Sequence, residues 1–333
     1  MINFGIIGAG HIAQTMATTV MQMEEVHLYG IASRSMDRAL QYKEQYHMEV
    51  AYDSYEALAE DEKVDVIYIA TPHSFHYEQA LMCLEKGKHV LCEKAFTINE
   101  KQARELVKTA EEKGLFLGEA IWTRFMPMAH KLQELIRSGV IGEVTHMTAN
   151  LNFPMLHKER LVKAELAGGA LLDVGIYPLT LASLVMGDEI ERIRAVGVLN
   201  KQGVDKVGQY TLIYKNGAIA DLNSGMCSIS DGDAYISGTG GLIVVKGVNF
   251  LRQIQVFNNQ WDLIEEYEPK DVGEYPYRNG ESVTGYEYEV KACAEAILAG
   301  KTECEEMTHQ QTVFMMHVMD EIRKQMGVRY PGE

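Results

Sequence analysis

The feature that most constrains this chain is a glycine turn that directly follows an apolar segment at residues 2–7. The turn reads Gly8-Ala9-Gly10-His11-Ile12-Ala13, and an apolar helical pattern continues through Val20. Gly8 permits a tight turn, and Gly10 lets the backbone approach a pyrophosphate because glycine has no Cβ. The N-terminus of the following helix offers N–H groups and a positive dipole end to phosphate. This order of strand, turn and helix predicts a dinucleotide site; the alternative is a purely structural turn.

Apolar strand-like segments alternate with helical patterns over the first 120 residues or so, which is typical of parallel βαβ units. We expect strands at 27–33, 64–70, 89–92 and 115–119 and helices at 73–86 and 99–113. Further along, strand-like segments recur from 193 to 268, separated by the hairpin signals Asn216-Gly217, Asp231-Gly232 and 238–241. Helices are expected near 126–138, 175–186, 286–299 and 309–325. We therefore predict an α/β protein with an N-terminal Rossmann domain, residues 1–122, and a C-terminal α+β domain, residues 123–333, built on an open, mainly antiparallel sheet.

The bulk composition restricts partners and compartment. Net charge is −16, from 31 basic and 47 acidic residues, which disfavours nucleic acid or an anionic membrane as a partner. No apolar run reaches the ~18 residues of a membrane span, and no signal-peptide pattern opens the chain. The five cysteines are scattered and form no C-x-x-C motif. We expect reduced thiols and a cytoplasmic protein.

The second expected strand ends in Ser33-Arg34-Ser35, without an acidic residue. A carboxylate at this position would bind the ribose 2′-hydroxyl of NAD and repel a 2′-phosphate, so its absence favours NADP. Arg34 can pair with that phosphate or stack on adenine, and Arg38 follows one helical turn later. The alternative is that Arg34 is only a solvated loop charge.

Two later strands end in residues suited to a ligand, because ligands bind at the carboxyl edge of a parallel sheet. Thr71 and Pro72 would form a wall beside the cofactor, with His73 and His76 following. His76 would lie near the nicotinamide half, or else pack the next helix; no second cluster of ligands supports a metal. Glu93-Lys94 ends the next strand, where the ammonium can hold a hydroxyl, although this dipeptide is also common on surfaces.

The densest stretch of the second half is Gly168–Pro178. Proline is tolerated in the first turn of a helix, so Pro178 places the helix start a few residues earlier. Asp173 then falls near the N-cap, and Tyr177, four residues later, shares its side of the helix. These two are either a cap and a packed tyrosine or a carboxylate and a phenol directed at a substrate.

Taken together, these motifs resemble the glucose-fructose oxidoreductase / inositol dehydrogenase (Gfo/Idh/MocA) family of oxidoreductases over essentially the whole chain. The motifs are the glycine turn, Ser33-Arg34-Ser35, Ala70-Thr71-Pro72-His73, Cys92-Glu93-Lys94, Trp122-Thr123-Arg124-Phe125 and Asp173–Pro178. The most similar branch is that of the dimeric dihydrodiol dehydrogenases and NADP-dependent D-xylose 1-dehydrogenases. Ala95 stands where many members have proline, and Tyr177 stands where the inositol dehydrogenase type has histidine.

The resemblance implies an NADP-dependent enzyme, with NAD possible, that transfers a hydride between nicotinamide and a hydroxyl carbon of a sugar or trans-dihydrodiol. Lys94 and Tyr177 would be the catalytic pair, since an ammonium lowers the pKa of a phenol, and Asp173 would orient the substrate hydroxyls. The expected cofactor contacts are Gly8, Gly10, His11, Ile12, Ser33, Arg34, Arg38, Thr71, Pro72, His73, His76, Glu93, Lys94, Trp122 and Arg124, with no metal.

The resemblance also implies a homodimer or higher homo-oligomer that takes a small-molecule sugar or diol. Pocket residues such as Phe153, Tyr275 or Tyr277 would come from loops. The alternatives are an NAD-dependent dehydrogenase of another polyol and a nucleotide-sensing regulator that has lost catalysis. Retention of both Lys94 and Tyr177 speaks against the regulator.

Overall fold

The computed structural model describes residues 1–272 and 284–333, and the chain forms two compact units. Within the described residues, unit 1 comprises Met1–Trp122 and residues 284–316, and unit 2 comprises residues 123–272 and His317–Glu333. The units are therefore not the two continuous segments, 1–122 and 123–333, that the sequence predicts. Tyr275 and Tyr277, expected near the substrate, lie outside the described residues.

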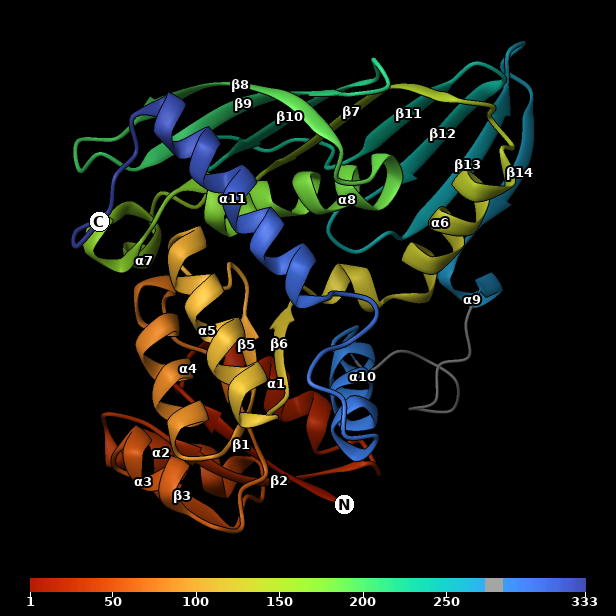
Figure 1. Ribbon diagram of the computed structural model, residues 1–333. Helices are drawn as coiled ribbons and strands as arrows, with labels where there is room; N and C mark the ends of the chain where they lie inside the picture. The colour runs from red at the N-terminus through yellow and green to blue at the C-terminus, as the bar shows by residue number, and fades with distance from the viewer. Residues whose placement is uncertain (273–283) are drawn as a thin grey trace. The chain divides into compact units, whose positions relative to one another are not determined.

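Unit 1 is a doubly wound sheet whose strands pair in parallel in the order β3-β2-β1-β4-β5-β6 (Figure 1). Its strands are β1 (Ile2–Ile7), β2 (Val26–Ala32), β3 (Val50–Tyr52), β4 (Val66–Ile69), β5 (His89–Glu93) and β6 (Leu117–Ala120). Its helices are α1 (His11–Val20), α2 (Met36–Gln45), α3 (Tyr55–Glu60), α4 (His76–Glu85), α5 (Glu100–Lys113) and α10 (Glu287–Leu298). This is the strand order of a Rossmann fold, which confirms the predicted class.

Residues 284–316 belong to unit 1 although they come late in the sequence, and hydrogen bonds to the edge strand β6 hold part of this segment there. The N–H of Leu117 donates to the carbonyl of Thr302 at 2.9 Å, and Nε2 of His309 lies 2.9 Å from the carbonyl oxygen of Leu117. Helix α10 packs against α1 in the same unit. A later segment thus satisfies backbone groups at the end of the Rossmann sheet, which no local pattern in the sequence indicates.

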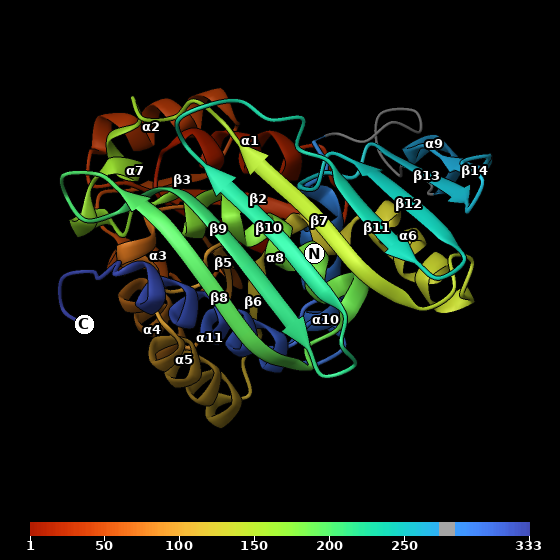
Figure 2. The same cartoon turned by 90° about the horizontal axis from the view of Figure 1, so that it is seen from above.

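Unit 2 is built on a mixed sheet, seen face on in Figure 2, with strand order β14-β13-β12-β11-β7-β10-β9-β8. Its strands are β7 (Val144–Asn152), β8 (Ile190–Leu199), β9 (Asp205–Tyr214), β10 (Ile219–Gly225), β11 (Ala234–Gly238), β12 (Gly241–Lys246), β13 (Gln253–Asn258) and β14 (Leu263–Tyr267). All neighbours pair antiparallel except β7 and β10. The prediction of a mainly antiparallel sheet is confirmed.

Two of the three predicted hairpin turns are found. Asn216-Gly217 joins the antiparallel pair β9 and β10, and residues 239–240 join β11 and β12. The Asp231-Gly232 prediction is wrong, because β10 and β11 do not pair; β7 lies between them in the sheet. The turn signal there marks a crossing from one part of the sheet to another.

The remaining helices are α6 (Pro127–Ser138), α7 (Glu159–Val162), α8 (Ile176–Met186), α9 (Pro269–Val272) and α11 (His309–Met326), the last divided between the units at Met316. Helix α8 lies along one face of the unit 2 sheet (Figure 1) and is buried almost throughout. By length and composition the helical stretch Ala164–Met186 could cross a membrane. The search for an uninterrupted apolar run in the sequence did not single out this stretch. Since 89% of its apolar window is buried inside the structure, it has the character of a core helix.

Helix α8 matches the predicted range, 175–186, to within one residue at its start. A π-helical turn, Leu171–Gly175, precedes α8 and continues directly into it. Asp173 lies inside this turn, and the N–H of Leu171 at its start donates to Oδ2 of Asp205, at 2.7 Å. Pro178 occupies the third position of α8, as expected for the first turn. The carboxylate at the start of this helical stretch therefore comes from another element, β9.

Candidate active site

The glycine turn in unit 1 has the backbone that the sequence predicts. Gly8 has a φ of +100°, and a Cβ there would come within 2.9 Å of the carbonyl oxygen of Ala70. Gly10 precedes α1 as its N-cap residue, and its carbonyl accepts a hydrogen bond from the Tyr42 hydroxyl at 3.0 Å. Ala13 is fully buried against the sheet. Gly8 is therefore required by conformation and by space.

Neither backbone conformation nor lack of space requires a glycine at position 10, so the space beside Gly10 is open to a ligand. A Cβ at Gly10 would meet no atom within 4 Å, and no side chain caps the N-terminus of α1. The turn thus leaves open space beside a helix N-terminus, which suits a diphosphate that approaches the backbone closely. His11 and Ile12 form the first turn of α1, with His11 exposed. The residues present fit a dinucleotide.

The segment after β2 carries the residues expected at the adenosine ribose. Ser33 is buried, and its Oγ accepts from the N–H of Ser35 at 3.2 Å. Arg34 and Arg38 are exposed. No acidic side chain occupies positions 33–35, so exposed cationic groups stand where a carboxylate would bind the 2′-hydroxyl of NAD.

At the end of β4, the imidazole of His76 is fully buried and its nitrogens face backbone carbonyls. Nε2 lies 2.8 Å from the oxygen of Thr71, and Nδ1 lies 2.9 Å from the oxygen of Ala95. The ring of His73 meets that of His76 edge to face, with centroids 5.7 Å apart. The hydroxyl of Thr71 donates to Gln79 at 2.6 Å, and Pro72 precedes a short 3₁₀ turn, His73–Phe75. His76 therefore ties the turn after β4 to the turn after β5.

Glu93 ends β5 and its carboxylate accepts a hydrogen bond from the hydroxyl of Tyr68 inside the core. Burial, with repulsion from Glu93, raises the pKa of Glu289 on α10 well above its usual range, and neither oxygen of Glu289 has a hydrogen-bond partner among the described residues. Lys94 follows, half-buried, and the Lys94–Ala95 peptide bond is cis. Tyr68 and Glu289 belong to this buried cluster, and no sequence motif pointed to either.

Trp122 and Arg124, both expected at the site, have different surroundings. The indole of Trp122 stacks on the ring of Tyr286, with centroids 4.6 Å apart and planes 5° from parallel. Arg124 is buried in unit 2, where Nη1 donates to Oγ of Ser183 at 3.4 Å. Phe153, expected in a pocket, is 38% exposed just after β7.

Asp173 and Tyr177 lie on consecutive turns of one buried helical stretch in unit 2. Asp173 is 5% exposed and Tyr177 is 7% exposed. Oδ1 of Asp173 accepts a hydrogen bond from Nη1 of Arg160 on α7, at 2.9 Å, so this carboxylate is charge-paired. Residues four apart on a helix share a side, which places a phenol and a carboxylate together. Arg160 was not predicted, because it lies on α7, a separate short helix, and no sequence pattern links it to Asp173.

None of the described residues forms a group of three or more His, Cys, Asp or Glu that could hold a metal ion. The chemistry that the described side chains offer is therefore that of buried carboxylates, a phenol, a lysine and hydrogen-bonding backbone.

Comparison with known proteins identifies the family. Residues 2–120 match the model of an oxidoreductase family with an NAD-binding Rossmann fold, GFO_IDH_MocA, and residues 129–244 match a GFO/IDH/MocA C-terminal domain. The chain is 33% identical to a trans-1,2-dihydrobenzene-1,2-diol dehydrogenase of Mus musculus and 31% identical to that of Homo sapiens, over 100% of this chain and 99% of each relative.

Solved structures agree with the family assignment. The 3-ketoreductase KijD10 of Actinomadura kijaniata, in complex with NADP and TDP-benzene, is 26% identical with a TM-score of 0.86 over 98% of both chains. An aldose-aldose oxidoreductase of Caulobacter crescentus, 20% identical with a TM-score of 0.85 over 97% of both chains, shares the fold. The chain belongs to the Gfo/Idh/MocA family of oxidoreductases and is an NAD(P)-dependent dehydrogenase.

Proposed function

We propose that this protein is an NADP-dependent dehydrogenase of a sugar or a trans-dihydrodiol, with Tyr177 as the general acid/base and Lys94 assisting it. The observation that carries the proposal is the buried pair Asp173 and Tyr177, four residues apart at the start of the α8 helix. A phenol can exchange a proton with a substrate hydroxyl, and a carboxylate held by Arg160 can accept a hydrogen bond from a neighbouring hydroxyl. Vicinal hydroxyls are common to sugars and trans-diols.

Oxidation of a secondary alcohol requires a base for the hydroxyl proton. In this proposal Tyr177 accepts that proton, and Lys94 stabilises the phenolate by its positive charge. Asp173 orients the second hydroxyl, so the carbon to be oxidised is fixed relative to Tyr177. In the reducing direction Tyr177 donates the proton to the carbonyl oxygen. When bound, the nicotinamide supplies the acceptor or donor of hydride.

The preference for NADP is supported by the loop after β2. Arg34 and Arg38 are exposed cations, and positions 33–35 carry no carboxylate that would repel a 2′-phosphate. A planar guanidinium binds phosphate oxygens in a bidentate manner. The NADP found in the KijD10 complex is consistent with this preference.

The decisive experiment compares Tyr177→Phe with the unaltered protein. Absorbance at 340 nm is followed with NADP and a panel of trans-1,2-dihydrobenzene-1,2-diol, D-xylose and D-glucose. For a substrate that turns over, Tyr177→Phe should lower kcat at least ~100-fold, while the Kd for NADPH, measured by fluorescence, changes less than about twofold.

Tyr214→Phe is the matched control. Tyr214 is another buried tyrosine of unit 2, 2% exposed, at the far end of β9, so the same loss of a hydroxyl there should leave kcat within about twofold. Near-normal turnover of Tyr177→Phe would remove Tyr177 from the mechanism. NADPH binding without turnover on any member of the panel would contradict the proposed substrate classes.

A further inference from the structure

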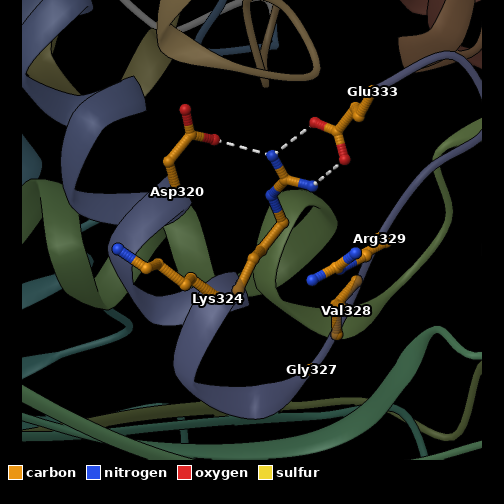
Figure 3. A pocket seen from close by; sticks show the side chains of 7 residues that line it. Asp320, Lys324, Gly327, Val328, Arg329 and Glu333 are labelled. Carbon is orange, nitrogen blue, oxygen red and sulfur yellow. Dashed lines mark hydrogen bonds and ion pairs between the residues drawn. The ribbon is translucent and has the colours of Figure 1, made fainter.

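The last residues of the sequence form an ion-paired cluster around Arg323 of α11 (Figure 3). Nη2 of Arg323 donates to Asp320 at 2.7 Å and to Glu333 at 2.8 Å, and Nη1 donates to the other oxygen of Glu333 at 2.9 Å. The guanidinium is 6% exposed beside a cavity of about 310 Å³. A bidentate, nearly buried pair of this kind holds both partners in one geometry.

This ion pair fixes Tyr330. The guanidinium of Arg323 lies over the Tyr330 ring, 4.7 Å from its centroid, and the N–H of Tyr330 donates to Glu333 at 2.9 Å. The Tyr330 side chain is buried, 4% exposed, and its hydroxyl donates to the carbonyl of Gly168 at 2.7 Å. The residues around Arg323 therefore connect to the glycine pair that precedes the π-helical turn.

On its other side, the same glycine pair is held by Asp205 of β9. Gly169 has a φ of +124°, and a Cβ there would overlap Oδ1 of Asp205 and lie 3.5 Å from the Tyr330 hydroxyl. Asp205 is fully buried, its Oδ2 accepts from the N–H of Leu171, and its Oδ1 has no hydrogen-bond partner among the described residues. Tyr330 and Asp205 thus bond to the two ends of one backbone segment, Gly168–Leu171.

The glycine pair also controls where Arg160 lies. The N–H of Gly169 donates to the carbonyl of Leu161 on α7 at 2.9 Å, and a Cβ at Gly168 would come within 2.5 Å of that carbonyl oxygen. Arg160 is the neighbour of Leu161 and donates to Asp173. Any shift of Gly168 and Gly169 therefore moves both the start of the helix and the arginine that holds Asp173.

We propose that Tyr330 and Asp205 are positioning residues for the reaction, fixing Gly168–Leu171 so that Asp173 and Tyr177 meet the substrate in a productive geometry. This inference rests on the proposed function of Asp173 and Tyr177. Neither Tyr330 nor Asp205 touches the substrate; each acts through the backbone. Small displacements of reacting groups, on the order of 1 Å, can lower the rate about 100-fold. Loss of the contacts that Tyr330 and Asp205 make with Gly168–Leu171 should therefore have a measurable effect on kcat.

The test is Tyr330→Phe, which removes only the hydroxyl and keeps the ring under Arg323. We expect kcat to fall at least about tenfold with the Kd for NADPH unchanged, because the change misaligns Asp173 and Tyr177 and leaves unit 1 untouched. Hydrogen exchange provides a readout that needs no substrate. The amides of 168–173 should exchange about tenfold faster, while amides in the middle of β9 keep their rates.

Tyr214→Phe again serves as the control, since it deletes a buried hydroxyl at the other end of the β9 strand that begins with Asp205. Both its kcat and the exchange of 168–173 should match those of the unaltered protein. Glu333→Gln is a second variant that keeps the Gly168 contact but weakens the ion pair with Arg323; it should change both readouts in the same direction and by less.

The outcomes separate this inference from the proposed function. If Tyr177→Phe abolishes turnover while Tyr330→Phe leaves kcat within about twofold and exchange unchanged, the positioning role is overturned and the proposed function stands. If exchange at 168–173 rises in Tyr330→Phe but kcat does not fall, the contact is only structural and the inference also fails. If Tyr177→Phe retains turnover, the proposed role of Tyr177 is wrong, and the positioning role of Tyr330 and Asp205, which rests on it, is overturned as well.

Discussion

Nδ1 of His76 lies 2.9 Å from the carbonyl oxygen of Ala95, the residue that follows Lys94. The other ring nitrogen lies 2.8 Å from the carbonyl oxygen of Thr71, and the imidazole is completely buried. The ring therefore joins the segments at the carboxyl ends of β4 and β5, where a parallel sheet binds its ligands. His76 holds these segments in place.

His76→Ala should lower the free energy of unfolding of the protein by about 3 kcal/mol, because it leaves a cavity and removes the N–H that the imidazole donates to a buried carbonyl. The urea midpoint followed by far-UV circular dichroism measures this loss. His27→Ala is the control: the His27 side chain is partly exposed and its Nε2 lies 2.9 Å from the Glu49 carboxylate, so its removal should cost less than about 1 kcal/mol. Equal losses in the two variants would contradict the bridging role.

The same histidine predicts a pH dependence. Burial lowers the pKa of His76 below its ordinary value of 6.5. Below that pH the unfolded chain therefore binds a proton that the folded chain does not, and stability falls as the pH drops through 6.5. The fall should be shallower in His76→Ala than in the unaltered protein when urea midpoints are compared at pH 7.5 and pH 5.5.

The two glycines of the turn should respond differently to substitution. Gly10→Ala places a methyl group in open space at a φ of −102°, so the protein should keep its urea midpoint. It should nevertheless weaken NADPH binding by at least about tenfold, because the methyl group blocks close approach of the pyrophosphate. Fluorescence titration with NADPH gives the Kd.

Gly8→Ala is the matched variant, since its Cβ would lie 2.9 Å from the Ala70 carbonyl oxygen at a φ of +100°. It should lose both stability and NADPH binding. A Gly10→Ala protein that binds NADPH normally would exclude this turn as the pyrophosphate site.

Arg34 should distinguish the two cofactors. If its guanidinium reads the 2′-phosphate, Arg34→Ala will raise the Kd for NADPH at least about tenfold and the Kd for NADH by less than about twofold. Because both ligands are titrated against the same variant, each serves as the control for the other. Equal loss of both affinities would mean that Arg34 only stacks on adenine.

Features that depend on neighbours in sequence were predictable. The strand, glycine turn and helix at 2–20 follow from apolar periodicity and the special backbone of Gly8, all within 20 residues. The short strand β3, Val50–Tyr52, was missed because three half-buried residues carry no period to detect. Helices α10 and α11 were predicted, but their assignment to a unit depends on hydrogen bonds to the edge strand β6, far away in the sequence.

The same distinction holds at the candidate site. Asp173 and Tyr177 could be selected because their spacing of four is a helical relationship within one segment. The residues that hold that segment are far from it in sequence. Arg160 lies 13 residues from its partner Asp173, and Asp205 lies 34 residues from its partner Leu171. Tyr330 lies 162 residues from its partner Gly168. Only the packing of α7, β9 and the end of the chain brings them together, so no local pattern marks them.

Asp205 should leave a signature in the pH dependence of stability. Burial raises the pKa of Asp205 from its ordinary 3.8 to about 6, against the opposing effects of the backbone N–H of Leu171 and the Arg323 guanidinium. The hydroxyls of Tyr210 and Tyr330 are the other titratable groups that face it. Between pH 4 and pH 6 the folded protein therefore holds a proton that the unfolded chain releases, so stability falls as the pH rises. The shift of about two units corresponds to about 3 kcal/mol by pH 7.

Asp205→Asn removes this titration while keeping the size of the side chain and an acceptor for Leu171. The difference in urea midpoint between Asp205→Asn and the unaltered protein should shift in favour of the variant as the pH rises from 4 to 7. Asp231→Asn should show almost no such shift over this range, because the hydrogen bond from Asn150 lowers the pKa of Asp231 below its ordinary 3.8, and the stabilisation from this carboxylate is lost only below that value. A pH-independent difference for Asp205→Asn would show that this carboxyl is ionised in the folded protein throughout the range, and that the amide of Leu171 faces a permanent negative charge.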